Sequence, residues 1–218
     1  MGAKTWMLVY ADGSPKERLA AKPLLDREAT QAWVSTLFPE HALEPNGDGD
    51  LSWTNPPDDE VFAGCFNGVS VIAAIEFGID VPSTLAKRFV QAAQGRDIYL
   101  HAMHSVVDWF AFALWQGGKL QRSLSLSPDS GILEDIGNQL AFELPYWQGE
   151  HSPIDPEDME DGEPDYPFAF HPLELGEAAL HEFFGYQLEG YIDDAMLAPE
   201  TIPLMRFKRK KKSRFKFW

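Results

Sequence analysis

The sequence predicts an α+β fold, with an antiparallel or mixed central sheet of about six strands and about three flanking helices. Residues 109–115 are apolar at every position, which fits a strand that is covered on both faces. The glycine pair at 117–118 supplies the positive φ values of a tight hairpin turn. Residues 98–104 and 120–127 have strand patterns on either side, so residues 98–127 are predicted to form a three-strand unit at the centre of the sheet.

The strand over residues 120–127 is predicted to be buried on one face only. Three leucines fall on that face, with Arg122 as the exception, and Gln121 and three serines alternate with them. This alternation is typical of an antiparallel strand with one face on the core and one face in solvent.

The other elements follow from the same kinds of pattern. In chain order, the sequence predicts a strand over 5–11, a helix over 23–38, a long loop over 40–60, paired strands over 61–66 and 69–77, and helices over 83–94 and 172–184. Three segments have weaker patterns. Residues 132–136 fit either a helical turn or a strand, residues 140–144 fit a short strand, and residues 186–188 fit an additional edge strand.

The composition indicates one globular domain, which we place at residues 1–205. A chain of 218 residues with 44% hydrophobic residues is long enough for a single core. Its one cysteine, Cys65, excludes an internal disulfide framework and a multi-cysteine zinc site. The longest apolar stretch, residues 61–79, is interrupted by Asn67 and Glu76, and no signal peptide is recognisable. The sequence thus predicts a soluble, cytoplasmic protein without a transmembrane segment.

The net charge of −16 conceals two segments of opposite sign. Residues 206–218 form a basic aromatic tail with eight lysines and arginines and no acid, which leaves a net charge of −24 on residues 1–205. Residues 150–165 contain eight acidic residues and no lysine or arginine, and are predicted to be a flexible loop. The tail is predicted to contact this acidic loop, to bind an anionic surface such as a membrane or a nucleic acid, or to remain solvated.

Several stretches of the chain have a distinctive sequence. They are residues 1–6, 47–57, 101–110, 123–131 and 171–177. Together they resemble an uncharacterised family of actinobacterial single-domain proteins of unknown function. The resemblance covers about residues 1–190, and the acidic loop and the basic tail are not part of it. It implies a single-domain layout and carries over no catalytic residue.

His101, His104 and Asp108 are the candidate catalytic residues. Imidazoles bind zinc or transfer protons, and an aspartate can orient one of them. On a helix the three side chains would share a face, whereas a strand over 98–104 places His101 and His104 on opposite faces. The alternative interpretation is a pair of hydrogen-bonded histidines at the end of a strand.

Asp48 and Asp50 are candidate binding residues, together with Asn46. They alternate with glycines and bring several oxygen atoms close together, as hard cations such as calcium require. The full calcium-loop pattern is missing, because no glutamate stands at the required distance. The alternative is a glycine-rich turn with solvated acids, and we predict no metal site.

Trp53 and Asn55 are the other two candidate binding residues. They lie beside Pro56 and Pro57, which stiffen the loop because proline fixes φ and restricts the residue before it. A rigid loop that carries an aromatic ring and an amide suits recognition. The alternative is that Trp53 only fills the core.

The function predicted from these observations is a non-enzymatic binding or interaction protein. Its partner would be an unidentified protein or small molecule, and no cofactor is predicted. The alternative is a metal-assisted or general acid–base hydrolase that uses the His101, His104 and Asp108 cluster.

Overall fold

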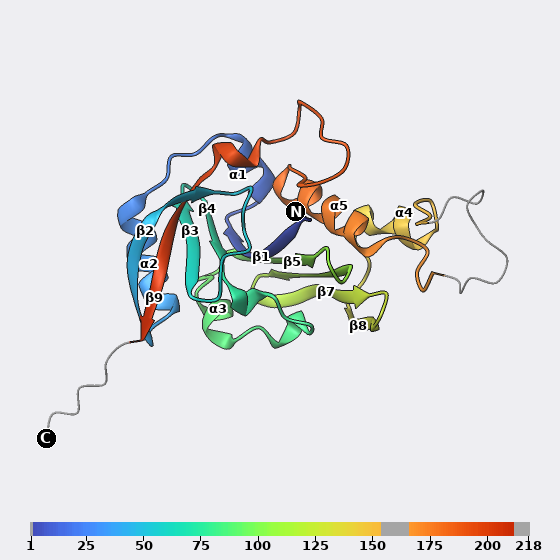
Figure 1. Ribbon diagram of the computed structural model, residues 1–218, viewed down its shortest axis with the longest axis horizontal. Helices are drawn as coiled ribbons and strands as arrows, with labels where there is room; N and C mark the ends of the chain where they lie inside the picture. The colour runs from blue at the N-terminus through green and yellow to red at the C-terminus, as the bar shows by residue number, and fades with distance from the viewer. Residues whose placement is uncertain (1, 154–165, 212–218) are drawn as a thin grey trace, which may run out of the picture.

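The structure is a computed structural model that describes residues 2–153 and 166–211. A sheet of nine strands, in the order β2-β9-β3-β4-β1-β5-β6-β7-β8, forms its centre, and neighbouring strands are antiparallel (Figure 1). The strands are β1 Lys4–Ala11, β2 His41–Asp50, β3 Glu60–Phe66, β4 Val69–Ala73, β5 Asp97–His104, β6 Trp109–Gln116, β7 Lys119–Ser127, β8 Gly131–Ile136 and β9 Pro203–Lys211. The prediction of about six strands with three flanking helices is therefore wrong.

Short helices connect these strands. In the described part of the chain, the α-helices are α1 Pro15–Ala20, α2 Arg27–Leu37, α3 Lys87–Gln91, α4 Leu144–Trp147 and α5 Pro172–Phe184. The 3-10 helices are η1 Ile75–Phe77, η2 Pro82–Thr84, η3 Ala141–Glu143 and η4 Pro199–Thr201. The predicted helix over 172–184 is confirmed as α5, which Gly185 ends with a φ of 84°.

Several shorter predictions differ from the structure. The predicted helix over 83–94 is divided between η2 and α3, and the predicted strand over 69–77 ends at Ala73, where η1 follows. Residues 140–144 contain η3 instead of a strand, and no strand forms over 186–188. Helix α1 occupies a segment that carried only a turn signal, because Ser14 accepts the Glu17 amide as an N-cap and Pro15 follows it.

The two edge strands, β2 and β8, account for part of the difference in strand number. Strand β2 lies inside the predicted loop over 40–60, and none of its residues is buried because it pairs only with β9. A strand at the edge of a sheet needs no alternation of apolar residues, so hydrophobic periodicity does not reveal it. Strand β8 pairs only with β7 and corresponds to the strand alternative for residues 132–136.

Strand β9 accounts for the remaining difference, because it contains the first residues of the predicted basic tail. It lies between β2 and β3, with Leu204 and Phe207 fully buried. Its basic side chains pair with acids of neighbouring segments: Arg206 with Glu60 at 2.9 Å, Lys208 with Asp59 at 2.6 Å, and Arg209 with Glu76 at 2.6 Å. These pairs offset the positive charge, so the basic residues of β9 take part in the sheet as far as Lys211.

Strand β6 confirms the prediction that residues 109–115 form an interior strand covered on both faces, although β1 and not β6 is the middle strand of the sheet. Phe110, Phe112 and Leu114 belong to one hydrophobic cluster. Trp109, Ala111, Ala113 and Trp115 belong to another cluster on the opposite face. Successive side chains of a strand point to opposite faces, so an entirely apolar run indicates a core on each side.

The helices cover both faces of the sheet (Figure 1). Helix α5 packs on β5 and β6 and contributes Leu180 and Phe184 to the first cluster. Helices α2 and α3 contribute Val34 and Phe89 to the second cluster. The Tyr10 hydroxyl donates a hydrogen bond of 2.8 Å to the Phe89 carbonyl, which ties β1 to α3. The domain is therefore a three-layer arrangement in which the sheet is the middle layer.

Strand β7 is buried on both faces beyond its first residues, so the prediction of a half-buried strand is wrong. Arg122 is fully buried and forms a two-bond ion pair with Glu143 of η3, at 3.0 and 2.7 Å. Ser123 donates to Glu134 of β8, and Ser125 accepts from the Trp109 indole at 3.1 Å. Polar side chains can be buried when each has a hydrogen-bond partner, and these partners come from other segments of the chain.

Residues 154–165, which make up most of the predicted acidic loop, lie outside the described residues, and so do residues 212–218 of the predicted tail. Across residues 2–153 and 166–211, none of the helices combines the length and the apolar character needed to cross a membrane.

Candidate functional site

His101 is fully buried on the face of β5 that α5 covers. Its Nε2 lies 2.9 Å from the Gly176 carbonyl and its Nδ1 lies 2.7 Å from the Thr5 hydroxyl. A carbonyl only accepts, so Nε2 carries the proton and Nδ1 accepts from Thr5. Burial lowers the pKa of His101 to about 4, so the ring is neutral near pH 7. This histidine joins β5, β1 and α5 and has no access to a substrate in solution.

His104 lies on the opposite face of β5, as the strand geometry predicts. Its ring is 5.8 Å from the Trp6 ring, and its Nδ1 accepts the Val106 amide at 3.2 Å. Partial burial, together with the Lys4 ammonium, lowers the pKa of His104. Asp108 follows in the β5–β6 turn and lies 3.7 Å from His171, at the start of α5, so it pairs with neither His101 nor His104.

The three candidate catalytic residues therefore do not form one cluster. No group of three or more histidine, cysteine, aspartate or glutamate side chains in the described residues is arranged to hold a metal ion. The geometry of His101 and His104 corresponds to the alternative of hydrogen-bonded histidines in a strand.

Asn46, Asp48 and Asp50 do not converge either. Asp48 forms a two-bond ion pair with Arg27 of α2, at 2.9 and 2.5 Å, and these hydrogen bonds lower the pKa of Asp48. Asp50 accepts hydrogen bonds from the amide and the hydroxyl of Ser52. The Asn46 amide donates to Glu60 at 3.1 Å. Each side chain thus has its own protein partner, and these contacts hold β2 and the following turn in place.

Trp53 and Asn55, by contrast, line one cavity of about 680 Å³. Thr54 between them is fully buried and bridges to Thr5, and its carbonyl accepts the Trp6 amide at 2.8 Å. The Thr54 contacts hold this loop against β1 and leave the two flanking side chains at the cavity. The Trp53 ring packs edge-on against Phe62, with ring centroids 5.7 Å apart, yet 47% of the residue is exposed. Trp53 is therefore partly a packing residue and partly an open surface.

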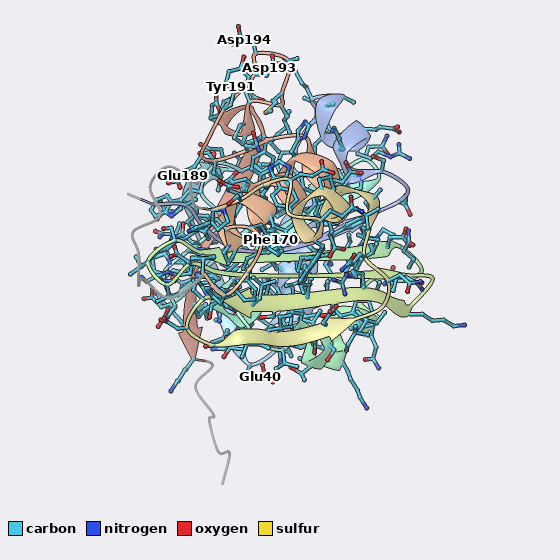
Figure 2. The ribbon with its side chains drawn as sticks, turned by 90° about the vertical axis from the view of Figure 1, so that its right-hand side faces the viewer. Glu40, Phe170, Glu189, Tyr191, Asp193 and Asp194 are labelled. Carbon is cyan, nitrogen blue, oxygen red and sulfur yellow. The ribbon has the colours of Figure 1, made fainter. Side chains whose placement is uncertain are left out.

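Three other segments complete the cavity. The N-terminal segment contributes Lys4, the β5–β6 turn contributes Val106, and the loop after α5 contributes Leu188 and Glu189. Glu189 also accepts the Ala3 amide at 2.8 Å, which joins the loop to the N-terminal segment. Figure 2 shows Tyr191, Asp193 and Asp194 at the outer end of this loop and Glu189 nearer the sheet.

Glu177 of α5 holds the loop from the other side. It accepts the Leu188 amide at 2.7 Å and the Glu189 amide at 3.2 Å, and the residue is only 7% exposed. Burial raises the pKa of Glu177 to about 7, although the two amide donors act in the opposite direction. Glu177 also lines a second cavity, of about 660 Å³, with Tyr146, His171 and Glu189.

The structure therefore brings Trp53 and Asn55 together with one residue of the β5–β6 turn, Val106, and with none of the candidate catalytic residues. His104 lines a separate cavity with Trp6 and Trp109. Analysis of the sequence did not identify Lys4, Leu188, Glu189 or Glu177. Glu177 lies on the otherwise apolar face of α5 that includes Leu180 and Phe184. An acidic residue on an apolar helix face was the feature of the sequence that could have indicated a buried carboxyl group.

Comparison of the chain with curated proteins and with solved structures gives no match. A model of the DUF6928 family, described as a family of unknown function, matches residues 5–207. This range includes all nine strands except the first residue of β1 and the last four of β9. It contains the second cavity and every residue that lines the cavity at Trp53 except Gly2, Ala3 and Lys4. The chain therefore belongs to the DUF6928 family of unknown function.

Proposed function

We propose that this protein is a binding protein, which takes a small amphipathic molecule into the Trp53 cavity. By the Trp53 cavity we mean the space lined by Gly2, Ala3, Lys4, Ser52, Trp53, Asn55, Val106, Leu188 and Glu189. The observation that carries the proposal is the half-exposed Trp53 ring in a cavity of about 680 Å³, which is within the range of small-molecule sites.

The apolar part of the ligand would lie on Trp53, Val106 and Leu188. Val106 is 75% exposed, which is high for an apolar side chain beside an exposed tryptophan. An indole ring gives a large, rigid surface for a flat apolar group. Covering these side chains would remove apolar surface from water, which favours binding by about 25 cal/mol for each Å².

The polar part of the ligand would lie at Lys4 and Asn55. Among the described residues, the Lys4 ammonium has no ion-pair partner and the Asn55 amide has no hydrogen-bond partner, whereas one Glu189 oxygen is occupied by the Ala3 amide. The free groups are thus mainly donors, so they suit an acceptor head group such as a carboxylate or a sulfonate. The net charge of −16 opposes a free anion at long range, so the contact with Lys4 would be essential.

A fluorescence titration with 8-anilinonaphthalene-1-sulfonate tests this proposal, because the probe combines flat aromatic rings with a sulfonate. Trp53→Leu and Lys4→Gln should each weaken binding about tenfold, which corresponds to a loss of about 1.4 kcal/mol. Val106→Ser should weaken it as well. The matched control is Val107→Ser, because Val107 is the next residue, is 49% exposed and lies outside the Trp53 cavity. Equal affinities for Val106→Ser and Val107→Ser, or unchanged binding in Trp53→Leu, would contradict the proposal.

We also propose a cytoplasmic location and an actinobacterial source. The free cysteine supports a reducing compartment, and the sequence resemblance supports the source. Fractionation of the native host, followed by detection of the protein with an antibody, tests the location. For the remaining part of the tail, residues 212–218, contact with an anionic surface stays a proposal, which sedimentation with anionic vesicles tests.

A further inference from the structure

We propose that residues 187–194, which we call the strap, form a movable wall of the Trp53 cavity, and that Glu177 is the latch that holds this wall closed, so that ligand affinity changes with pH near neutrality. The inference rests on the proposed function, because it concerns access to the same cavity. It assigns a role to a buried acid that the binding site itself does not contain.

The latch is defined by geometry. The two carboxylate oxygens of Glu177 accept the amides of consecutive residues, Leu188 at 2.7 Å and Glu189 at 3.2 Å. Leu188 and Glu189 are the strap residues that line the Trp53 cavity. One side chain on the rigid helix α5 therefore fixes the position of the part of the strap that the ligand would touch.

The strap has few other connections to the rest of the domain. Among the described residues, the strap forms one hydrogen bond to another segment besides the two to Glu177. In this bond the Ala3 amide donates to the Glu189 carboxylate at 2.8 Å. Leu188 packs against the edge of the first hydrophobic cluster, and residues 189–194 are exposed. Hydrogen bonds near the far end are local, such as the one from the Met196 amide to the Asp193 carbonyl. A segment with so few buried contacts opens at a low free-energy cost.

The surroundings of Glu177 favour a proton on its carboxyl group. Burial raises its pKa to about 7, and the nearby Glu189 carboxylate acts in the same direction. The titratable groups around it come from three parts of the chain. The strap and the residues before it contribute Glu189, Tyr191 and Tyr186, helix α5 and its N-cap contribute Glu174 and His171, and α4 with the residues after it contributes Tyr146 and His151. No lysine or arginine is among the described residues that line this second cavity, so no strong cation there keeps Glu177 ionised.

The direction of the effect follows from which state of the strap binds the proton more readily. With the strap closed, burial raises the pKa of Glu177 to about 7, whereas an open strap exposes the carboxyl group to water and removes this effect. The closed state therefore holds the proton more tightly, and above pH 7 the closed strap covers a buried carboxylate, which costs free energy. We therefore expect the strap to open more often as the pH rises, and the affinity for a ligand in the Trp53 cavity to fall roughly tenfold between pH 6 and pH 8.

The first experiment measures the latch without any ligand. In a ¹⁵N-resolved NMR titration of the full chain from pH 5.5 to 8.5, the amide signals of Leu188 and Glu189 should shift with a midpoint near 7. Glu177→Gln should abolish this shift. The control is Glu174→Gln, one turn earlier on α5, since Glu174 lines the same second cavity but its carboxylate accepts no strap amide. A Leu188 signal that titrates equally in wild type and Glu177→Gln would overturn the latch.

The second experiment measures the coupling to the Trp53 cavity. Titrations with 8-anilinonaphthalene-1-sulfonate at pH 6 and pH 8 should show about tenfold weaker binding at pH 8 for wild type and for Glu174→Gln. Glu177→Gln should bind equally at both values of pH, with the stronger affinity, because the neutral amide resembles the protonated acid. Equal affinity of wild type at both values, with Leu188 titrating normally, would overturn the coupling. If the probe fails to bind wild type at either pH, the proposed function fails, and the amide titration still decides whether Glu177 holds the strap.

Discussion

Acid should destabilise this protein partly through His101, and the size of the effect follows from its surroundings. The ring is fully buried between β1, β5 and α5, and burial lowers its pKa from 6.5 to about 4. Each unit by which the pKa of His101 differs between the folded and the unfolded state corresponds to 1.36 kcal/mol. The neutral ring therefore contributes about 3 kcal/mol to the free energy of unfolding.

The sign of this contribution is set by which state binds the proton more readily. Between pH 6.5 and about 4 the unfolded chain binds a proton on His101 and the folded chain does not. The contribution is therefore complete above pH 6.5 and is lost as the pH falls toward 4. A glutamine at this position keeps an acceptor for Thr5 and a donor for the Gly176 carbonyl but does not titrate.

The assay is urea unfolding of wild type and His101→Gln at pH 7.5, 6.5, 5.5 and 4.5. Wild type should be more stable than the variant at pH 7.5, and this difference should shrink by up to about 3 kcal/mol as the pH is lowered to 4.5. Other carboxylates titrate in both proteins and cancel in the difference. A difference that stays constant across the series would refute the reasoning, because it would mean that the ring is not held neutral by burial.

Three further predictions concern the fold. Arg122→Met should lower the free energy of unfolding by about 3–5 kcal/mol, because it leaves the fully buried Glu143 carboxylate without its cation. Asp135→Asn should lower it by under about 1 kcal/mol, because the Asp135 side chain is 43% exposed. Equal losses for the two variants in urea unfolding would contradict this prediction. Gly176→Ala should lower the melting temperature, although alanine favours helices. The added Cβ would lie 2.8 Å from the Met103 sulfur and 3.1 Å from the Phe110 ring, and such overpacking costs about 1–3 kcal/mol. A higher melting temperature would show that α5 shifts to make room for the methyl group. Deletion of residues 206–218 should remove the cooperative unfolding transition, because most of β9 is then lost from between β2 and β3. Deletion of residues 212–218 alone should preserve the transition. An unchanged transition after the deletion of 206–218 would show that β9 is dispensable.

The hairpin of β6 and β7 was predictable because its signal is local. The apolar run over 109–115 and the glycine pair after it predict a buried strand and a hairpin, and β6 and β7 occupy those positions. Helix α5 was predictable for the same reason, with Pro172 at its start and Gly185 at its end. Each of these patterns describes how a segment meets its own immediate surroundings.

Strand β9 and the buried charges were not predictable in this way. Strand β9 carries a basic sequence that suggested a solvated tail, and it is stable in the sheet because Arg209 meets Glu76, 133 positions earlier. Arg122 breaks the alternation of β7, and its burial depends on Glu143 in η3. A charged residue is buried only where its partner is also present, and the partner is found by the fold.

The candidate site divides along the same line. The sequence alone determined that Trp53 and Asn55 lie beside two prolines, that His101 and His104 lie on opposite faces of a strand, and that residues 109–115 form a strand with apolar cover on both faces. Only the tertiary structure decided that Lys4, Val106 and Leu188 meet Trp53 at one cavity, and that Glu177 holds the strap beside it. The physical reason is that hydrophobic periodicity reports how one segment is buried, whereas a cavity and its electrostatics depend on segments far apart in the chain that the packing of the core brings together.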